Sequence, residues 1–377
     1  MRIAFDLRRI KNPGIGRYMQ CLVEAVLAQE SRHEFLLILP PDAPAMIANA
    51  KDKAEQLSSG LKYYSLREQL ELPRILRRHR IDLLHAPHFV LPLMGSCITV
   101  ATIHDVIYLA CKEDLPSWAG RMYYRGMMAA STRKADRIIT VSEFSRADIV
   151  RFLKVDPARI EVVYSGISPA FQPVRNPSRI QEVKRRYGIS GEYILYAGIY
   201  KPRKNHAGLL RAMQKLIGAG VPAQLVIAGA IDEGRAELKK LATELKIADI
   251  VIFAGFIDDS DLAVLYSGAR VYACPSLYEG FGFTVLEAMA SGTPVVCSSA
   301  TSLPEVAGEA ALYADPRNPD EFAHALARVF YDNELRTQLV ASGHENCRRF
   351  SWESAAARTL AVYESAGEEA LRKVVYA

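Results

Sequence analysis

Short apolar segments alternate with longer segments of helical periodicity along the chain, and this alternation limits its fold more than any other feature. The short segments are continuous apolar runs, as expected of strands buried on both faces of a sheet. They are Arg2–Leu7, Phe35–Pro40, Leu83–His85, Ile98–His104, Arg137–Val141, Ile160–Tyr164, Tyr193–Gly198, Gln224–Gly229, Ile250–Gly255, Val271–Pro275 and Pro294–Ser298. Strand and helix in alternation predict an α/β fold with parallel sheets covered by helices on both faces.

The grouping of these strands predicts two domains. A segment rich in proline and polar residues, 169–178, separates the first six strands from the other five and is typical of a linker. The 377 residues are enough for two domains, each with its own core. Because open α/β sheets bind ligands beyond the carboxyl ends of their strands, two Rossmann-like domains with facing sheets would bind them in an interdomain cleft.

Composition argues against several other classes of protein. No stretch reaches the roughly 18–20 apolar residues that span a bilayer, and the opening R-I-A-F-D-L is too quickly charged for a signal peptide. The six cysteines include no C-x-x-C pair, so we expect reduced thiols in a cytoplasmic protein rather than disulfides or a zinc site.

Charge is spread unevenly between the two halves. Residues 1–173 hold 24 Lys and Arg against 18 Asp and Glu, whereas the remaining residues hold 23 against 24. This excess is too small for a nucleic-acid-binding protein, but it suits a first half that meets an anionic surface or substrate.

Two glutamates, Glu279 and Glu287, bracket the run E-G-F-G-F-T-V-L-E. Gly280 and Gly282 let the backbone approach a ligand closely, and a glycine turn that opens a helix presents N–H groups to an anion such as a phosphate. The run therefore predicts a sugar-nucleotide site. The alternative for the two acids alone is a strand–loop–helix junction whose carboxylates only cap or solvate the helix.

Three segments, the last of which contains this run, resemble the retaining glycosyltransferases of family 4, which have the two-domain GT-B fold. The segments are Y-I-L-Y-A-G-I-Y-K-P-R-K-N (193–205), V-I-F-A-G-F-I-D-D-S-D-L (251–262) and A-C-P-S-L-Y-E-G-F-G-F-T-V-L-E-A-M-A-S-G-T-P-V-V (273–296). The resemblance covers nearly the full chain. It implies an acceptor-binding domain over 1–172 with the last helix, 352–377, packed back on it, and a donor-binding domain over 173–351.

The activity implied by the resemblance is transfer of a hexose from a nucleotide diphosphate sugar to an acceptor hydroxyl, with retention and without metal or cofactor. Glu287 would bind the donor ribose, and Glu279 would bind hydroxyls of the transferred sugar. The backbone amides of Gly282 and Phe283, with Thr284 beside them, would hold the donor diphosphate.

The family also places cations on the leaving diphosphate, and here the chain departs from the pattern. Lys204 stands where the family has a lysine, but the arginine that usually follows the glycine at 198 is replaced by Ile199. Arg203 or Lys201 could supply the missing charge. Adjacent side chains of an extended segment point to opposite sides, so Arg203 and Lys204 would share one phosphate only if the loop turns between them.

Further site residues are expected at other strand ends. In the family, the loop that matches Gly14–Arg17 approaches the donor diphosphate and the acceptor. The resemblance therefore implies that Gly16 contacts the donor and that Arg17 adds a positive charge on the acceptor side. A histidine in the place of His104 lies near the transferred sugar. His85 and His88 end the preceding strand and could line the acceptor side or be structural.

The loop Gly255-Phe256-Ile257 corresponds to the family's contact with the nucleobase; the plain alternative is a βα turn. Asp259-Ser260-Asp261 has the form of the D-x-D metal motif of another glycosyltransferase fold. Because a helical pattern follows, we instead expect an N-cap and first-turn acids there, and no metal site.

The segments Leu70–Arg80 and Trp118–Met128 mix arginines with apolar and aromatic residues. Such segments occur on anionic membrane surfaces, and this suggests peripheral contact with the inner face of the membrane. The alternative is an ordinary helix with one core face and one solvated face.

The segment P-R-K-N near Lys204 is most similar to bacterial mannosyltransferases of polysaccharide assembly. We therefore expect GDP-mannose as the donor and a glycan or polyprenol-linked glycan as the acceptor. Two alternatives remain open, a GT-B epimerase or hydrolase that acts on the donor alone, and a subunit that binds the nucleotide sugar without catalysis.

Overall fold

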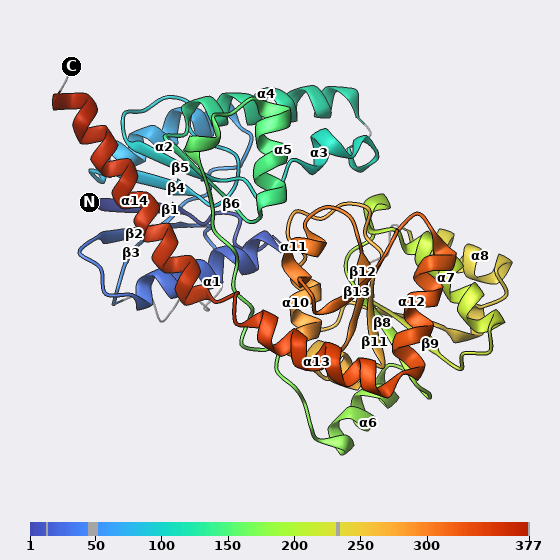
Figure 1. Cartoon of the computed structure of the whole chain (residues 1–377). Coiled ribbons are helices and arrows are strands. Elements are labelled where there is room, and N and C mark those ends of the chain that lie inside the picture. Colours follow the sequence, from blue (N-terminus) through green and yellow to red (C-terminus); the bar gives the residue numbers. More distant parts are fainter. Residues whose placement is uncertain (13, 44–51, 116, 231–233, 376–377) are drawn as a thin grey trace. The chain divides into compact units, whose positions relative to one another are not determined.

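The structure, a computed structural model, describes residues 1–12, 14–43, 52–115, 117–230 and 234–375 (Figure 1). The chain divides into two compact units. The first comprises Met1–Ala110, Leu115–Gly166 and the chain from Phe350 onward, and the second comprises Cys111–Asp114 and Ile167–Arg349. The long C-terminal helix thus belongs to the first unit, although the last two residues of the expected helix, 376 and 377, lie outside the described residues.

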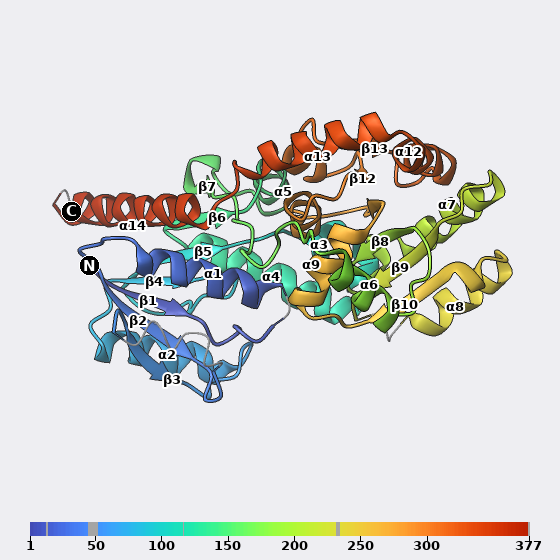
Figure 2. The same ribbon diagram turned by 90° about the horizontal axis from the view of Figure 1, so that it is seen from below.

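The first unit is built on a parallel sheet of seven strands among its described residues, in the order β3-β2-β1-β4-β5-β6-β7. The strands are β1 (Arg2–Asp6), β2 (Glu34–Leu39), β3 (Glu55–Ser58), β4 (Leu83–Ala86), β5 (Ile98–Thr102), β6 (Arg137–Thr140) and β7 (Ile160–Val162). The helices are α1 (Ile15–Ala28), α2 (Leu66–Arg78), α3 (Ile107–Ala110), α4 (Trp118–Lys134), α5 (Glu143–Leu153) and α14 (Trp352–Val375). Figure 2 shows α14 beside α1, where Gln29 donates a hydrogen bond to the carbonyl of Glu353.

The second unit has a parallel sheet of six strands among its described residues, in the order β10-β9-β8-β11-β12-β13. The strands are β8 (Tyr193–Ala197), β9 (Gln224–Ala228), β10 (Val251–Gly255), β11 (Val271–Cys274), β12 (Val295–Ser298) and β13 (Ala311–Ala314). The helices are α6 (Pro177–Arg186), α7 (His206–Gly218), α8 (Arg235–Glu244), α9 (Asp259–Gly268), α10 (Phe283–Ala290), α11 (Leu303–Ala307), α12 (Pro319–Tyr331) and α13 (Asn333–Cys347).

The predicted α/β fold with two parallel sheets is confirmed, and each unit has a core of its own. In the second unit, the strand residue Leu195 is fully buried and the α12 residue Leu326 packs in the core from one face of the sheet. In the first unit, Leu84 is equally buried and Met128 of α4 joins its core. The strands are continuous apolar runs because helices cover both faces of each sheet, so that side chains pointing to either face are buried. No helix in the described ranges is long and apolar enough to cross a membrane.

All eleven predicted strands are present, with ends within two residues of those expected. Two strands were not predicted. β3 has the sequence E-Q-L-S, lies at the sheet edge and is largely exposed, so it lacks the apolar run of a buried strand. β13, A-L-Y-A, lies at the other sheet's edge and is only four residues long.

A candidate donor-side site

An ion pair lies beyond the carboxyl ends of β8 and β11, two neighbouring strands in the sheet of the second unit. Nζ of Lys204 lies 2.6 Å from Oε1 of Glu279. The hydroxyl of Ser276 donates a hydrogen bond of 2.6 Å to the same carboxylate oxygen. Both charged side chains are mostly buried, at 15% and 10% exposure. The pair therefore stands where open α/β sheets bind their ligands.

The carboxyl group of Glu279 is held in its charged form. Burial by itself would raise its pKa, but the ammonium of Lys204, the Ser276 hydroxyl and the charge of Arg203 together lower the pKa below its ordinary value. A buried carboxylate can accept hydrogen bonds from sugar hydroxyls. Lys204 beside it places a positive charge at the same strand ends.

The segment that carries Lys204 is not extended but forms a single turn of 3-10 helix, Pro202–Lys204. Asn205 ends the turn in the left-handed conformation, with φ of 57°. Its amide nitrogen donates to the carbonyls of Pro275 and Pro316, at 3.1 and 2.7 Å. Asn205 thereby ties the turn to the end of β11 and sets Lys204 beside Glu279.

Arg203 turns to a different partner. Its guanidinium pairs with the carboxylate of Asp114, whose side chain is fully buried in the second unit. The backbone carbonyl of Arg203 also accepts a hydrogen bond of 2.7 Å from the N–H of Leu277. The two adjacent cations thus have separate carboxylate partners, and Lys204 is the one placed on Glu279.

Glu287 lies inside α10 and is 4% exposed. The hydroxyl of Tyr266 donates to its Oε2 at 3.3 Å. The helix starts after Gly282, which has φ of 109°, and a Cβ there would come within 2.7 Å of Leu303. The turn that opens α10 therefore requires a glycine at position 282. Phe283 and Thr284 are the first two residues of the helix.

The loop after β10 keeps an exposed aromatic ring. Gly255 ends the strand with φ of 74°, and its carbonyl accepts a hydrogen bond of 2.7 Å from Gly229. Phe256 is 83% exposed, whereas the next residue, Ile257, is buried. The backbone contact with a nucleobase that was expected of this loop did not include an exposed aromatic ring.

The acidic run at 258–261 is part of the fold. The N-cap of α9 is Asp258, one residue before the run in which an N-cap was expected, and Asp259 and Asp261 are the first-turn acids. Asp258 accepts a hydrogen bond of 2.9 Å from the N–H of Asp261. The buried Asp261 carboxylate pairs with Arg179 at 2.8 Å and with Arg186. Among the residues described, no group of three His, Cys, Asp or Glu side chains is arranged to hold a metal ion.

In the first unit, the glycines after β1 serve a tight turn. Gly14 has φ of 77° and precedes α1. A Cβ on Gly16 would come within 1.9 Å of the carbonyl oxygen of Ile10, so no other residue fits there without a shift of backbone. Arg17 follows on α1 and is partly exposed.

His104 follows β5 and is partly exposed. Its Nε2 donates to the carbonyl of Pro87 at 3.1 Å, and its ring packs edge-on against Tyr18 with 4.5 Å between centroids. Burial lowers its pKa to about 4, with a smaller contribution from His88. The imidazole is therefore neutral near pH 7, which suits a hydrogen bond to a sugar hydroxyl rather than a fixed positive charge.

His85 and His88 lie in the interior of the first unit. His85 has no exposed surface, and its two ring nitrogens lie 2.6 Å from the hydroxyl of Tyr363 and 2.8 Å from that of Thr102. His88 is 1% exposed and accepts a hydrogen bond from the N–H of Val90 at 2.9 Å. These contacts favour the structural alternative for both residues.

A buried ionic cluster lies at the end of β1. The guanidinium of Arg8 reaches the carboxylates of Asp6 and Glu68, each at 2.7 Å, and all three side chains are at most 2% exposed. The hydroxyl of Tyr63 donates to Asp6 at 3.0 Å. Burial opposes the charge on Asp6, yet Arg8 lowers its pKa well below the usual range, whereas burial raises the pKa of Glu68. The cluster fastens the loop after β1 to the start of α2.

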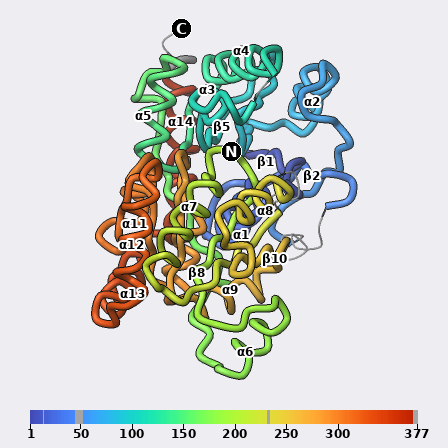
Figure 3. Tube along the Cα trace, turned by 90° about the vertical axis from the view of Figure 1, so that its right-hand side faces the viewer, coloured from blue at the N-terminus to red at the C-terminus, as the bar shows by residue number. Residues whose placement is uncertain are grey.

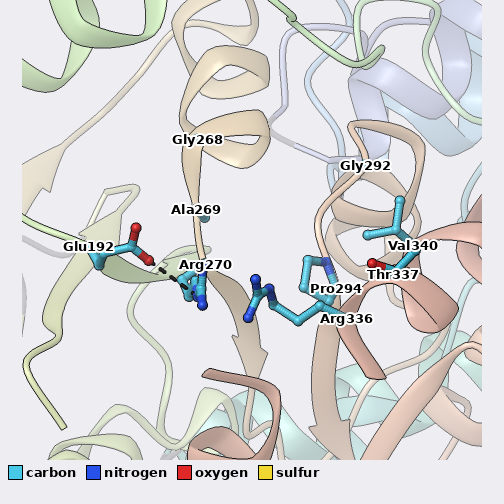
Figure 4. A pocket seen from close by; sticks show the side chains of 9 residues that line it. All are labelled: Glu192, Gly268, Ala269, Arg270, Gly292, Pro294, Arg336, Thr337 and Val340. Carbon is cyan, nitrogen blue, oxygen red and sulfur yellow. Dashed lines mark ion pairs between the residues drawn. The ribbon is translucent and has the colours of Figure 1, made fainter. Parts of the chain in front are cut away.

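A separate pocket lies at the opposite, amino-terminal ends of β11 and β12 (Figure 4). Its two arginines, Arg270 and Arg336, point into it, but each also bonds within the fold. Arg270 pairs with Glu192 at 3.3 Å, and Arg336 donates to the carbonyl of Phe330 at 3.1 Å. Arg270 also donates to the carbonyl of Phe330 at 2.9 Å, so both arginines brace the end of α12. The pocket lies at the opposite strand ends from Lys204 and Glu279.

Known proteins are similar to this chain over nearly its whole length. Residues 180–346 match the family of glycosyl transferases group 1, and residues 14–171 match glycosyltransferase family 4. The O-antigen chain mannosyltransferase B of Escherichia coli is 33% identical over 382 residues, covering 97% of this chain and 100% of that protein. The MMP alpha-(1->4)-mannosyltransferase of Mycolicibacterium hassiacum is 36% identical over 246 residues, covering 64% and 56% of the two chains.

Solved structures agree with the architecture. HepE from Anabaena, crystallised in complex with UDP and glucose, superposes with a TM-score of 0.77 at 18% identity, covering 97% of this chain and 100% of that chain. At that identity the likeness concerns the fold alone.

Proposed function

The chain belongs to the glycosyltransferases of family 4 and has their GT-B fold, and on this basis we propose that it transfers mannose from GDP-mannose with retention of configuration. The acceptor is a hydroxyl of a glycan or polyprenol-linked glycan in polysaccharide assembly. The donor proposal is supported by the relatives named mannosyltransferases, one of which matches over its full length.

The observation that carries the proposal is the pair of Lys204 and Glu279 at the strand ends of the second unit. When the glycosidic bond breaks, negative charge grows on the leaving diphosphate, and a nearby cation stabilises it. Lys204 supplies that cation, and the amides at the start of α10 add N–H groups. The neighbouring Glu279 carboxylate binds hydroxyls of the transferred sugar.

The proposed mechanism is attack from the face that the diphosphate leaves. The departing phosphate oxygen accepts the proton of the incoming hydroxyl, so that no side chain must act as a base. Glu287 binds the ribose of the donor. Because Nε2–H of the neutral His104 donates to the carbonyl of Pro87, its Nδ1 accepts a hydrogen bond from a hydroxyl of the sugar.

The first experiment tests the nucleotide. GDP at about 100 times its Kd should stabilise the protein by about 2.7 kcal/mol, which for a unit of this size corresponds to a rise in Tm of roughly 5–10 °C. UDP at the same concentration should give a smaller rise, and both shifts should be unchanged by EDTA. Stabilisation by UDP alone would refute GDP-mannose as donor. Turnover that stops in EDTA and returns with Mg²⁺ would refute metal independence.

The second experiment separates Glu287 from Glu279. Glu287→Ala should raise the donor KM by about 10-fold or more, since a hydrogen bond to a charged group is worth roughly 1.5–3 kcal/mol and a ribose contact is made in ground and transition states alike. Glu279→Gln should lower kcat instead, because its contact to the reacting sugar strengthens as charge develops. Steady-state kinetics and GDP titrations measure both effects. Equal losses of GDP affinity in the two variants would contradict this division.

Incubation with donor alone distinguishes the remaining alternatives. Rapid release of GDP or a changed sugar without any acceptor would indicate a hydrolase or epimerase. Binding of the donor with no turnover under any acceptor would indicate a non-catalytic subunit.

A further inference from the structure

Two consecutive hydroxyl residues after β12, Thr301 and Ser302, bind the loop that carries Glu279. They precede the short helix α11, which is drawn in orange in Figure 3. Oγ1 of Thr301 accepts a hydrogen bond of 3.1 Å from the N–H of Glu279, and the hydroxyl of Ser302 donates to the carbonyl of Glu279 at 3.0 Å. Both backbone groups of Glu279 are therefore held by side chains that lie more than twenty residues further along the chain.

Ser302 does not play the role that its position favours. It is fully buried and occupies the N-cap of α11, yet its side chain makes no cap hydrogen bond. A serine at an N-cap usually accepts a hydrogen bond from a backbone N–H of the first turn, as the serines that cap α2, α4 and α5 all do: Ser65, Ser117 and Ser142. The Ser302 hydroxyl instead donates to the carbonyls of Glu279 and Phe281, each at 3.0 Å.

Thr301 has an unfavourable backbone conformation. Its φ is 62°, in the left-handed region, where a β-branched residue is an outlier. Strained conformations of this kind persist where a functional site needs them. Glycine would adopt this φ without steric cost, but it has no hydroxyl to accept the hydrogen bond from Glu279. That hydrogen bond accounts for a threonine at this position.

The two hydrogen bonds of Ser302 fix the orientation of two peptide groups. The described peptide bonds are all trans, so the N–H of each peptide group points opposite to its C=O. Because the carbonyls of Glu279 and Phe281 point to Ser302, the N–H groups of Gly280 and Gly282 point away from it. Neighbouring backbone N–H groups that point the same way make a concave site for an anion.

We propose that Thr301 and Ser302 are positioning residues for the diphosphate of the donor. They fix the backbone of Glu279 and turn the amides of Gly280 and Gly282 toward the leaving group. The inference rests on the proposed function, because it assigns these amides to the same donor site. Both hydroxyls act through the backbone of the loop, so their effect should depend on the phosphates of the ligand and not on its nucleoside.

Ser302→Ala is the first test. It removes the hydroxyl without removing a cap hydrogen bond from α11. GDP affinity should fall by about 10-fold or more, as for a lost hydrogen bond to a charged group, whereas the affinity for guanosine, which has no phosphate, should not change. The value of kcat should fall by about 10- to 100-fold, less than the loss typical when a donor to the developing charge is removed outright. Isothermal titration calorimetry and steady-state kinetics measure these effects.

The second test compares two changes at Thr301. Thr301→Val keeps the β-branched shape and removes the hydroxyl, so it should lower kcat by about 3- to 10-fold. Thr301→Ser keeps the hydroxyl and should retain the kcat of the parent. If Ser302→Ala is unfolded at the assay temperature, this pair decides between the outcomes, and equal kcat values for Thr301→Val and Thr301→Ser would contradict the inference.

The matched control is Ser267→Ala in the same unit. The Ser267 hydroxyl also donates to two carbonyls, those of Ala263 and Ser291 at 2.9 and 3.2 Å, but it lies near the end of α9, which leads into the amino-terminal end of β11. This variant should unfold at a lower temperature and keep the kcat and GDP affinity of the parent.

Three results would overturn the inference and leave the proposed function intact. They are parent-like kcat and GDP affinity in Ser302→Ala, an equal loss of GDP and guanosine affinity in that variant, and an equal loss of kcat in Ser267→Ala. A parent protein that binds neither GDP nor UDP would refute the proposed function itself, and the inference with it.

Discussion

Lys204→Ala should lower the rate of sugar transfer by a factor of about 10² to 10³, the usual loss when one electrostatic stabiliser of a developing charge is removed. The family's second cation is replaced here by Ile199, which is 40% exposed and cannot bind a phosphate. We therefore expect Lys204 to carry a larger share of the leaving-group charge than in relatives that have both cations. The loss should appear mainly in kcat, because the charge grows in the transition state.

The matched control is Arg203→Ala on the adjacent residue. Its guanidinium pairs with Asp114, whereas the Lys204 ammonium lies 2.6 Å from Glu279. We therefore expect a smaller loss for Arg203→Ala. Near-normal kcat for Lys204→Ala together with a collapse for Arg203→Ala would show that the roles of the two cations are reversed.

Ile199→Arg tests whether the two positions face one diphosphate. It restores the charge where the family carries it, and it should recover part of the activity that Lys204→Ala loses. Thermal unfolding of the double variant checks that Glu279, which loses its ammonium partner in Lys204→Ala, has not destabilised the fold.

Arg8→Met should destabilise the first unit by about 3–5 kcal/mol, the usual cost of removing one partner from a buried ion pair. The change leaves Asp6 and Glu68 as two buried carboxylates without the guanidinium that lies 2.7 Å from each. For a unit of this size the loss corresponds to a fall in Tm of about 6–20 °C. Differential scanning calorimetry measures it, and because the chain has two units, the transition is followed for each separately.

Arg67→Met is the control for this prediction. Arg67 also pairs with a glutamate, Glu71, but its side chain is 76% exposed. Exposed pairs of this kind contribute about 0.3–0.5 kcal/mol, so the transition should hardly move. A similar Tm in Arg8→Met and Arg67→Met would mean that the buried cluster is not what holds the loop after β1 to α2.

Much of the fold could be predicted because it depends on local pattern. Every strand with a continuous apolar run was identified, since burial on both faces demands such residues. β3 and β13 were missed because each lies at a sheet edge, where a short or polar strand is tolerated. These two segments are extended because they pair with β2 and β12, and their own sequences do not indicate a strand.

In the site, too, local sequence predicted which residues are present, and tertiary contacts decided how they pair. Spacing and resemblance placed Lys204, Glu279 and Glu287 in one predicted donor site, and the turn residues Gly16 and Gly282 were marked by their glycines. That Lys204 pairs with Glu279, 75 residues away, follows only from the crossover of β8 and β11. The 3-10 turn at Pro202–Lys204, fastened by Asn205 to two distant carbonyls, separates the partners of Arg203 and Lys204.

By itself, the sequence determined which segments form the strands buried on both faces, which glycines make tight turns and which residue types are available for a diphosphate and a sugar. These properties belong to short stretches of chain, where side-chain size, branching and spacing act locally. Tertiary structure alone decided that His85 is enclosed between Thr102 and Tyr363, that Arg8 joins two carboxylates, and that Trp118 points to solvent. Burial, charge pairing and exposure depend on groups far apart in the chain, and no local pattern specifies them.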